Sequence, residues 1–371
     1  MIRIDEIYFN VFKKYIDKHI PLTRLFFCDP PGNTNPENLI NYGHDIEEHS
    51  YIFLHDQEPV FLDTHKNLFE DVVRRNKDIQ DVSKNNSKAI IHSEYNSEFV
   101  QCVSEKYDWN SYYYFFHGWA ALDWFRGYNY SYLIDDPYNR KIKSSYIAPN
   151  RIIAGKRDHR VLLFYNLAKR KINTAKISMP KICPYENKSI NTIAKKYEKQ
   201  YPDIMSVISN CRLPWNFEGE TGHPMESCWL GLFDECNESL AYIITETVFS
   251  GRRNHLTEKT FKPICMQMPF ILLSTVGSLE YLRSYGFLTF SEFWNEDYDY
   301  EQNDIKRIEK VAKTANDLDN LSEKELNQLY RHMVPTLQHN YNHFYNGGFQ
   351  KILWKELTDM LEQIKMDFKN D

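Results

Sequence analysis

The stretch YIITETVFSGRRNHLTEKTFKPICMQMPFILLSTVGSLEYLRSYGFLTF, residues 242–290, decides the fold of this chain. Its apolar, β-branched run over 242–245 predicts a strand, and so does the apolar run over 270–274. Thr-Glu-Lys ahead of spaced apolar residues predicts a helix over 257–265, and a second helix is expected over 278–286. A strand–helix–strand–helix pattern builds a parallel sheet, so the chain is predicted to be an α/β protein.

Polar residues follow both predicted strands at the point where each strand ends. Glu246 comes directly after the first strand, a polar and basic connection over 250–255 follows it, and Gly277 lies in the loop after the second strand. Ligands of open parallel sheets bind at the carboxyl ends of the strands. We therefore expect the functional site at this edge.

The charges at this edge indicate what the site binds. Arg252, Arg253 and Lys259 place three cations within eight residues, beside a helix start whose first N–H groups lack partners. That combination suits a diphosphate. Glu246 and Glu258 are poor neighbours for phosphate but good acceptors for sugar or ribose hydroxyls. Fixed cations together with two carboxylates favour a nucleotide sugar over a bare nucleotide.

A purely structural interpretation of the same residues stays open at this point. In that interpretation Thr257 caps the helix and Glu258 interacts favourably with the helix dipole, while the two arginines are solvated side chains.

The same stretch resembles a known family. Glu246-Thr247, the basic connection and the segment 256–261, Leu-Thr-Glu-Lys-Thr-Phe, resemble the donor-site motif of the α-1,3-fucosyltransferases. In that motif a glutamate precedes a Tyr/Val-Thr-Glu-Lys-Leu helix and a Pro-Val-Val-Gly strand, whose counterpart here is Met-Pro-Phe-Ile-Leu at 268–272. Residues 287–290 and 297–299 also resemble segments of phage and viral glycosyltransferases.

The resemblance implies a GT-B architecture, with two Rossmann-like domains facing a central cleft and a C-terminal helix that crosses back. It also implies an inverting transfer that needs no metal ion or other cofactor. The acceptor-side motifs of the fucosyltransferases are not recognisable. The transferred sugar therefore stays open among hexoses, fucose and pentoses, and the acceptor among a glycan, a protein and a modified DNA base.

The domain boundaries follow from the length and the pattern. A chain of 371 residues is more consistent with two domains than with one. We predict an acceptor-side α/β domain over 1–145 and a nucleotide-sugar-binding α/β domain over 146–340. A C-terminal helix over 341–371 would pack across the junction. Residues 180–230 are rich in proline and are expected to form a loop-rich insertion that shapes selectivity.

Composition excludes several classes of protein. Hydrophobic residues make up 42% of the chain, which argues against a disordered protein, and a net charge of −6 gives no general attraction to nucleic acid or anionic membrane. No apolar run is long enough to span a membrane, and the N-terminus does not resemble a signal peptide. Seven scattered cysteines predict reduced thiols and a cytoplasmic location. Abundant Asn, Lys, Ile and Tyr fit an AT-rich genome and are compatible with a viral source, in which case the location is the host cytoplasm.

The first half of the chain offers candidates for a catalytic base. Strands predicted over 51–55 and 88–92 run directly into acidic residues, and these supply the candidates Asp56, Glu58 and Glu94. An inverting transfer needs such a base near the acceptor hydroxyl, and we favour the pair Asp56 and Glu58. The alternative is that Asp56 or Ser93 only caps the next helix.

A third apolar strand is expected to begin at Tyr112 and to end in His117 and Gly118, with Trp119 directly after it. His117 is a further candidate for the base, and Trp119 is a candidate for stacking on an acceptor sugar, although a core position suits an aromatic residue of this chain at least as well. In the second half, Arg157 and Arg160 precede an apolar helix over 161–169 and are further candidates for binding the donor phosphates.

Two other functions stay open on the sequence alone. Asp297-Tyr298-Asp299 matches an Asp-x-Asp manganese motif of metal-dependent GT-A transferases, but its flanks are polar, whereas that motif follows an apolar strand. A non-catalytic sugar- or nucleotide-binding protein, such as a structural part of a virus, is the other alternative. Slow hydrolysis of a nucleotide sugar would separate an enzyme from a binding protein.

Overall fold

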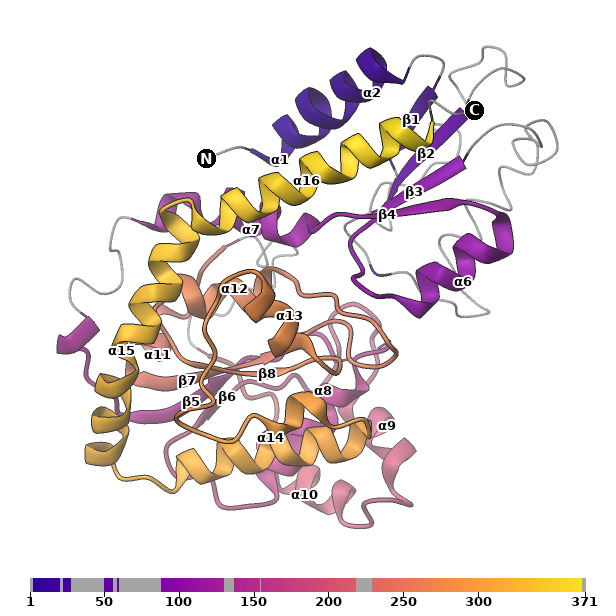
Figure 1. Cartoon of the computed structure of the whole chain (residues 1–371). Coiled ribbons are helices and arrows are strands. Elements are labelled where there is room, and N and C mark those ends of the chain that lie inside the picture. Colours follow the sequence, from indigo (N-terminus) through magenta and orange to yellow (C-terminus); the bar gives the residue numbers. More distant parts are fainter. Residues whose placement is uncertain are drawn as a thin grey trace. The chain divides into compact units, whose positions relative to one another are not determined.

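A computed structural model describes residues 3–20, 23–27, 50–55, 59, 88–129, 137–153, 155–217 and 229–368. The chain folds as two compact units (Figure 1), each with its own parallel sheet. The first unit comprises Met1–Asp123, Gly251–His255 and Gln350–Asp371, and the second comprises Trp124–Ser250 and Leu256–Phe349. The sequence predicted a boundary near residue 145, whereas the chain enters the second unit at Trp124.

The first unit is built on a four-stranded parallel sheet in the order β1-β2-β3-β4. Its strands are β1 Thr23–Phe27, β2 Ser50–His55, β3 Lys88–His92 and β4 Asn110–Tyr113. Strands β2 and β3 are almost entirely buried, as expected for apolar runs without alternation in a parallel sheet. Their register places His55 beside His92 at the carboxyl end.

Short helices accompany this sheet. They are α1 Ile4–Glu6, the π-helix η1 Ile7–Lys13, α2 Lys14–His19, α6 Glu98–Tyr107 and α7 Phe116–Trp124. The prediction of one strand running from Tyr112 to Gly118 is wrong. The strand ends at Tyr113, and a helix, α7, begins at Phe116. Nearly every residue of α7 is buried, so its sequence lacks the periodicity that distinguishes a helix from a strand.

The second unit contains the sheet that the sequence predicted from residues 242–290. Its strands are all parallel, in the order β6-β5-β7-β8. They are β5 Ser144–Ala148, β6 Lys176–Ile177, β7 Ser239–Thr245 and β8 Phe270–Leu273. Helices cover both faces (Figure 1): α8 Asp158–Ala168 and α14 Asp304–Asp319 lie on one face, and α12 Glu258–Cys265 lies on the other. A mixed α/β fold with Rossmann-like parallel sheets is therefore confirmed.

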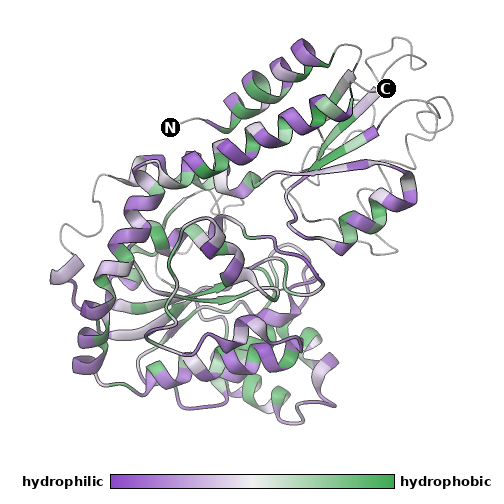
Figure 2. Ribbon diagram, in the orientation of Figure 1, coloured by the Kyte–Doolittle hydropathy of each residue, from purple (hydrophilic) through white to green (hydrophobic). Residues whose placement is uncertain are grey.

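The remaining elements of the second unit are helical. They are η3 Arg126–Asn129, η4 Pro137–Asn139, α9 Ile190–Ala194, η5 Lys195–Tyr197, α10 Ile204–Asn210, α11 Phe233–Glu238, α13 Ser278–Ser284, η7 Asp297–Tyr300 and α15 Glu323–Tyr345. Helices α9 and α10 lie in the segment predicted to be loop-rich. In Figure 2 the helices around the second sheet carry both hydrophobic and hydrophilic colours, as helices with one buried side do.

The last helix, α16 Gly348–Asp367, belongs to the first unit from Gln350 onward. Glu356 accepts a hydrogen bond from the backbone N–H of Phe115 at 3.0 Å, and Trp354 packs edge-on against Trp119. The C-terminal helix therefore completes the core of the N-terminal unit.

Candidate functional site

The carboxyl edge of the second sheet carries a buried polar network. Thr245, the last residue of β7, donates a hydrogen bond from Oγ1 to Asn150 Oδ1 at 3.2 Å. The backbone N–H of Asn150 donates to Ser178 Oγ at 3.0 Å, which links the ends of β5 and β6. All three side chains are buried. The network fixes the strand ends, from which the candidate site residues extend.

Glu246 follows Thr245 and binds the start of α12. Its Oε1 accepts hydrogen bonds from the Thr257 backbone N–H at 3.0 Å and from Thr260 Oγ1 at 2.7 Å, and its Oε2 accepts one from Thr257 Oγ1 at 2.6 Å. The carboxylate is fully buried. Glu246 therefore holds strand β7 and helix α12 together, and this is the contact that the structure gives for it.

Lys259 and Glu258 form an ion pair in the first turn of α12. Lys259 Nζ lies 2.7 Å from Glu258 Oε1 and donates a second hydrogen bond to Thr257 Oγ1 at 3.2 Å. The Glu258 side chain is buried, whereas that of Lys259 is 31% exposed. An ammonium group has three donors, so one N–H of Lys259 is available for a ligand in these contacts. Thr257 also caps the helix, as the structural interpretation predicts.

Arg160 is a buried cation near this pair. Its two terminal nitrogens donate to the backbone carbonyls of Ile152 and Thr245, both at 2.8 Å, and its Nε has no partner among the described residues. Burial lowers the pKa of Arg160 to about 9, and the positive charge of Arg157 lowers it further, while the carboxylates of Glu246 and Glu258 act in the opposite direction. The structure thus brings two arginines and two carboxylates together at one strand end.

His159 was not singled out in the sequence, although it stands beside Arg160. Its Nε2 is 3.0 Å from the Glu246 carbonyl oxygen, and its ring stacks on Phe249 at 4.6 Å between centroids. Burial lowers the pKa of His159 well below its usual range, which keeps the ring neutral. A histidine between two arginines in sequence is a signal that was present but that has no fixed meaning without the fold.

The end of β8 is organised by Asp299. Its Oδ1 accepts a hydrogen bond from the Leu279 N–H at 2.9 Å, at the start of α13, and its backbone carbonyl accepts one from the Gly277 N–H at 2.8 Å. Asp297, by contrast, is exposed and pairs with Lys310 at 3.1 Å. The two carboxylates of the Asp-x-Asp triplet thus have separate partners. Within the described residues, no group of three or more His, Cys, Asp or Glu side chains is placed to hold a metal ion.

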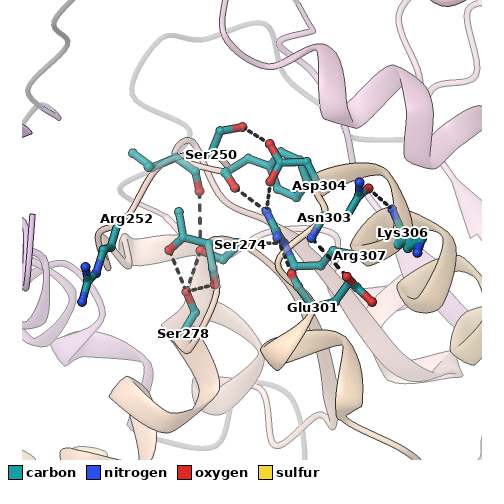
Figure 3. A network of polar contacts seen from close by, with 12 residues as sticks. Ser250, Arg252, Ser274, Ser278, Glu301, Asn303, Asp304, Lys306 and Arg307 are labelled. Atoms are coloured by element: carbon teal, nitrogen blue, oxygen red, sulfur yellow. Dashed lines mark hydrogen bonds and ion pairs between the residues drawn. The ribbon is translucent and has the colours of Figure 1, made fainter. Parts of the chain in front are cut away.

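Arg307 links the loops after β7 and β8 (Figure 3). Its guanidinium donates to the backbone carbonyls of Ser274, Phe249 and Glu301 at 2.9, 2.7 and 2.7 Å, and it pairs with Asp304 at 2.6 Å. Its side chain is 2% exposed. A buried arginine that satisfies three carbonyls holds the loops of the carboxyl edge in a fixed arrangement.

The other two predicted cations belong to the first unit. Arg253 is buried, forms an ion pair with Glu94 at 2.9 Å and lies over the ring of Phe99 at 4.3 Å. The backbone of Arg252 exchanges hydrogen bonds with Glu98. The structure therefore separates these arginines by unit from Lys259, Arg157, Arg160 and Gly277, which all lie in the second unit.

The first unit has its own polar cluster at the carboxyl end of β3. His255 Nδ1 lies 3.3 Å from the Ser93 carbonyl oxygen, and its ring meets that of His117 edge-on at 5.1 Å. Glu94 accepts a hydrogen bond from Ser97 at 2.5 Å in addition to its pair with Arg253, so both of its oxygens are engaged. Trp119 is 1% exposed and lies in the core of this unit. The candidates Asp56 and Glu58 lie outside the described residues.

Comparison with known proteins adds little to this geometry. No protein-family model and no curated protein matches the chain. Among solved structures, it is similar to the N-terminal domain of trehalose-6-phosphate phosphatase from Candida albicans, with a TM-score of 0.37 and 11% sequence identity over 86% of this chain and 72% of that chain. A TM-score of this size carries no argument. The described part of the chain contains no helix that is both long and apolar enough to cross a bilayer.

Proposed function

We propose that this protein is a glycosyltransferase that moves a sugar from a nucleotide-diphosphate sugar to an acceptor hydroxyl, and that its second unit binds the donor. The observation that carries the proposal is the group of charges after β5 and β7. Buried Arg160 bonds only to backbone carbonyls among the described residues, and Arg157 and the ion pair of Lys259 and Glu258 act at the same strand ends.

The charges of this group suit a diphosphate. A buried guanidinium without a direct carboxylate bond is costly, and a bound anion would compensate its charge. Arg157 is half-buried and Lys259 is 31% exposed, so both are within reach of a ligand. In this assignment Arg157 and Lys259 contact the phosphates, and Arg160 supports them from beneath.

The carboxylates have different roles in this proposal. Glu258 is paired with Lys259 and can accept a hydrogen bond from a sugar or ribose hydroxyl through its second oxygen. Both oxygens of Glu246 are taken by Thr257 and Thr260, so Glu246 positions α12 and with it Lys259. The requirement for a glutamate ahead of the Thr-Glu-Lys helix is thereby explained as a structural one.

The GT-B arrangement, the inverting outcome and the absence of a metal requirement are parts of the same proposal, supported by the resemblance of residues 242–290. The catalytic base would come from the first unit. Asp56 and Glu58 remain candidates, and His117 in its histidine cluster is another, while the engagement of both Glu94 oxygens makes Glu94 less suited to the task.

A panel of nucleotide sugars in a thermal-shift assay tests the proposal. A donor at a concentration of 100 times its Kd should stabilise the protein by about 2.7 kcal/mol, which raises the unfolding temperature by a few degrees. The matching donor should also be hydrolysed slowly by the protein without an acceptor. Stabilisation without hydrolysis would favour the non-catalytic binding protein, and no stabilisation by any donor would contradict both.

The acceptor is left open by these residues. A modified DNA base remains one option alongside a glycan and a protein, and glucosylation assays on these three acceptor classes with the donor found by thermal shift would separate them.

A further inference from the structure

Two large apolar side chains are exposed at the carboxyl edge of the second sheet, on the segment after β6. Tyr185 is 52% exposed and Ile182 is 49% exposed. Single exposed apolar residues are normal on protein surfaces. These two differ because they stand on a rigid hairpin beside the group of charges assigned to the donor diphosphate.

The hairpin is fixed by backbone hydrogen bonds. The N–H of Cys183 donates to the carbonyl of Lys188 at 2.8 Å, the N–H of Asn187 donates to the carbonyl of Cys183 at 3.1 Å, and Ile182 forms an isolated antiparallel bridge with Ser189. The side chain of Cys183 is buried under the turn. Tyr185 is therefore presented to solvent from an ordered backbone, so that a ligand stacking on it orders little more than the side chain.

Arg151, in the loop after β5, holds the ring of Tyr185. Its guanidinium carbon lies 5.8 Å from the ring centroid, and its Nη2 donates a hydrogen bond to the Tyr185 hydroxyl at 3.1 Å. A guanidinium and a phenol ring joined in this way form an extended planar surface. Aromatic rings and guanidinium planes are the surfaces on which nucleobases stack.

The hairpin touches the loop that leads to the arginines. A side-chain carbon added at Gly155 would lie 2.8 Å from Glu186 Oε1 and 3.6 Å from Arg157 Nη1. The thiol of Cys183 also acts on the charge of Arg160. The planar surface and the two arginines are thus neighbours in one unit.

The order of these groups along the sheet follows the order of the parts of a nucleotide sugar. The strands run β6-β5-β7, with Tyr185 after β6, the arginines after β5, and Glu258 and Lys259 after β7. Neighbouring strands are about 4.8 Å apart, so the span from β6 to β7 is about 10 Å. A base, a diphosphate and a sugar fit that sequence of an aromatic surface, cations and a carboxylate.

We propose that Tyr185 and Arg151 form the platform on which the nucleobase of the donor stacks. This inference rests on the proposed function and adds to it the position of the base. It predicts that the platform contributes to binding of a nucleoside diphosphate but not to binding of inorganic pyrophosphate, which has no base.

The experiment compares calorimetric affinities for GDP, UDP and inorganic pyrophosphate in the full chain. Tyr185→Ala should weaken the nucleoside diphosphate that binds the parent best by about 5- to 150-fold, the range for loss of one base–aromatic stack, and should leave pyrophosphate unchanged. Tyr185→Phe keeps the ring and should stay within about threefold of the parent, and Arg151→Ala should weaken the same ligand selectively. Tyr138→Ala, at a tyrosine that is 49% exposed, is the matched control and should change neither affinity.

The outcomes separate this inference from the function on which it rests. If Tyr185→Ala binds the nucleoside diphosphate as the parent does while Lys259→Gln weakens it, the platform is overturned and the donor site stands. Equal weakening of pyrophosphate in Tyr185→Ala also overturns the platform, because the effect would then not depend on the base. If the parent protein binds neither GDP nor UDP, the proposed function and the platform are both overturned.

Discussion

Glu246 Oε2 lies 2.6 Å from Thr257 Oγ1, and Glu246 Oε1 lies 3.0 Å from the backbone nitrogen of the same threonine. One carboxylate at the end of β7 thus takes both donors of the residue that caps α12. A third hydrogen bond, from Thr260, completes its coordination. The first turn of α12, which carries Lys259, is therefore held to the sheet by a buried charge-assisted contact rather than by packing alone.

Replacing Glu246 should destabilise the second unit. Glu246→Gln keeps the shape but loses the charge and should lower the free energy of unfolding by about 1–3 kcal/mol. Glu246→Ala leaves the Thr257 donors unsatisfied in the core and should lower it further. Urea unfolding of both variants measures the effect, and parent-like stability in Glu246→Ala would show that the contact is dispensable.

Lys259→Gln should weaken donor binding without large loss of stability. A charge-assisted hydrogen bond to phosphate is worth roughly 1.5–3 kcal/mol, which corresponds to about a 10- to 150-fold higher Kd. Lys262→Gln, on the same helix, is the matched control and should bind the donor as the parent does. Calorimetry with the donor identified by thermal shift compares them, and equal affinities in the two variants would remove Lys259 from the site.

The two glycines that flank α13 should respond differently to alanine. Gly277 and Gly286 have φ values of +75° and +89°, so alanine at either position adopts a left-handed conformation that costs about 1–2 kcal/mol. An added Cβ at Gly277 meets no atom within 4 Å, whereas at Gly286 it would lie 2.8 Å from His343 Nε2. Gly286→Ala should therefore lower the melting temperature more than Gly277→Ala, and the reverse order would contradict the geometry.

The stability of the first unit should fall with acid through His92. Burial lowers the pKa of His92 to about 3, and the neighbouring charge of His55 adds to this. The unfolded chain binds a proton near pH 6.5 and the folded chain does not until about pH 3, so this contribution is complete above pH 6.5 and is lost as the pH falls, at about 1.4 kcal/mol per pH unit. In His92→Gln, the loss of unfolding free energy between pH 7 and pH 5 should be smaller than in the parent. An identical loss in both proteins would show that His92 does not carry it.

Arg307→Lys should destabilise the loops at the carboxyl edge. An ammonium group cannot reach the three carbonyls and one carboxylate that the guanidinium satisfies, and the buried acceptors left without donors should cost roughly 3 kcal/mol. Exposed Lys306 is the control, since Lys306→Ala should change the free energy of unfolding by less than about 0.5 kcal/mol. Hydrogen exchange at residues 249–250 and 274–278 should be faster in Arg307→Lys only.

The sheets could be predicted from sequence because their strands are continuous apolar runs. Strands β2, β3, β7 and β8 begin and end within one to three residues of the predicted positions. Helix α7 could not be predicted, because a helix buried on all sides has no polar face to mark its period. The class of the fold follows from the runs, and the error falls where the pattern is uniform.

The candidate site was predicted in part. That Glu246, Glu258 and Lys259 lie at one strand end follows from the order of strand and helix. That Thr257 and Thr260 take both oxygens of Glu246 does not, since side-chain pairing is set by packing. The contrast between Lys259 and Arg253 makes the same point, because Arg253 pairs with Glu94 from a distant part of the sequence.

The short segment Gly251–His255 belongs to the first unit although the chain on both sides of it belongs to the second. It forms an antiparallel bridge from Asn254 to Tyr95 and supplies Arg253 to Glu94. The last helix likewise joins the first unit after the second is complete. No single cut in the gene can therefore yield either unit whole. A fragment ending at Asp123 would lack an ion-pair partner and a core helix, so the ribosome must finish the chain before the N-terminal unit can close.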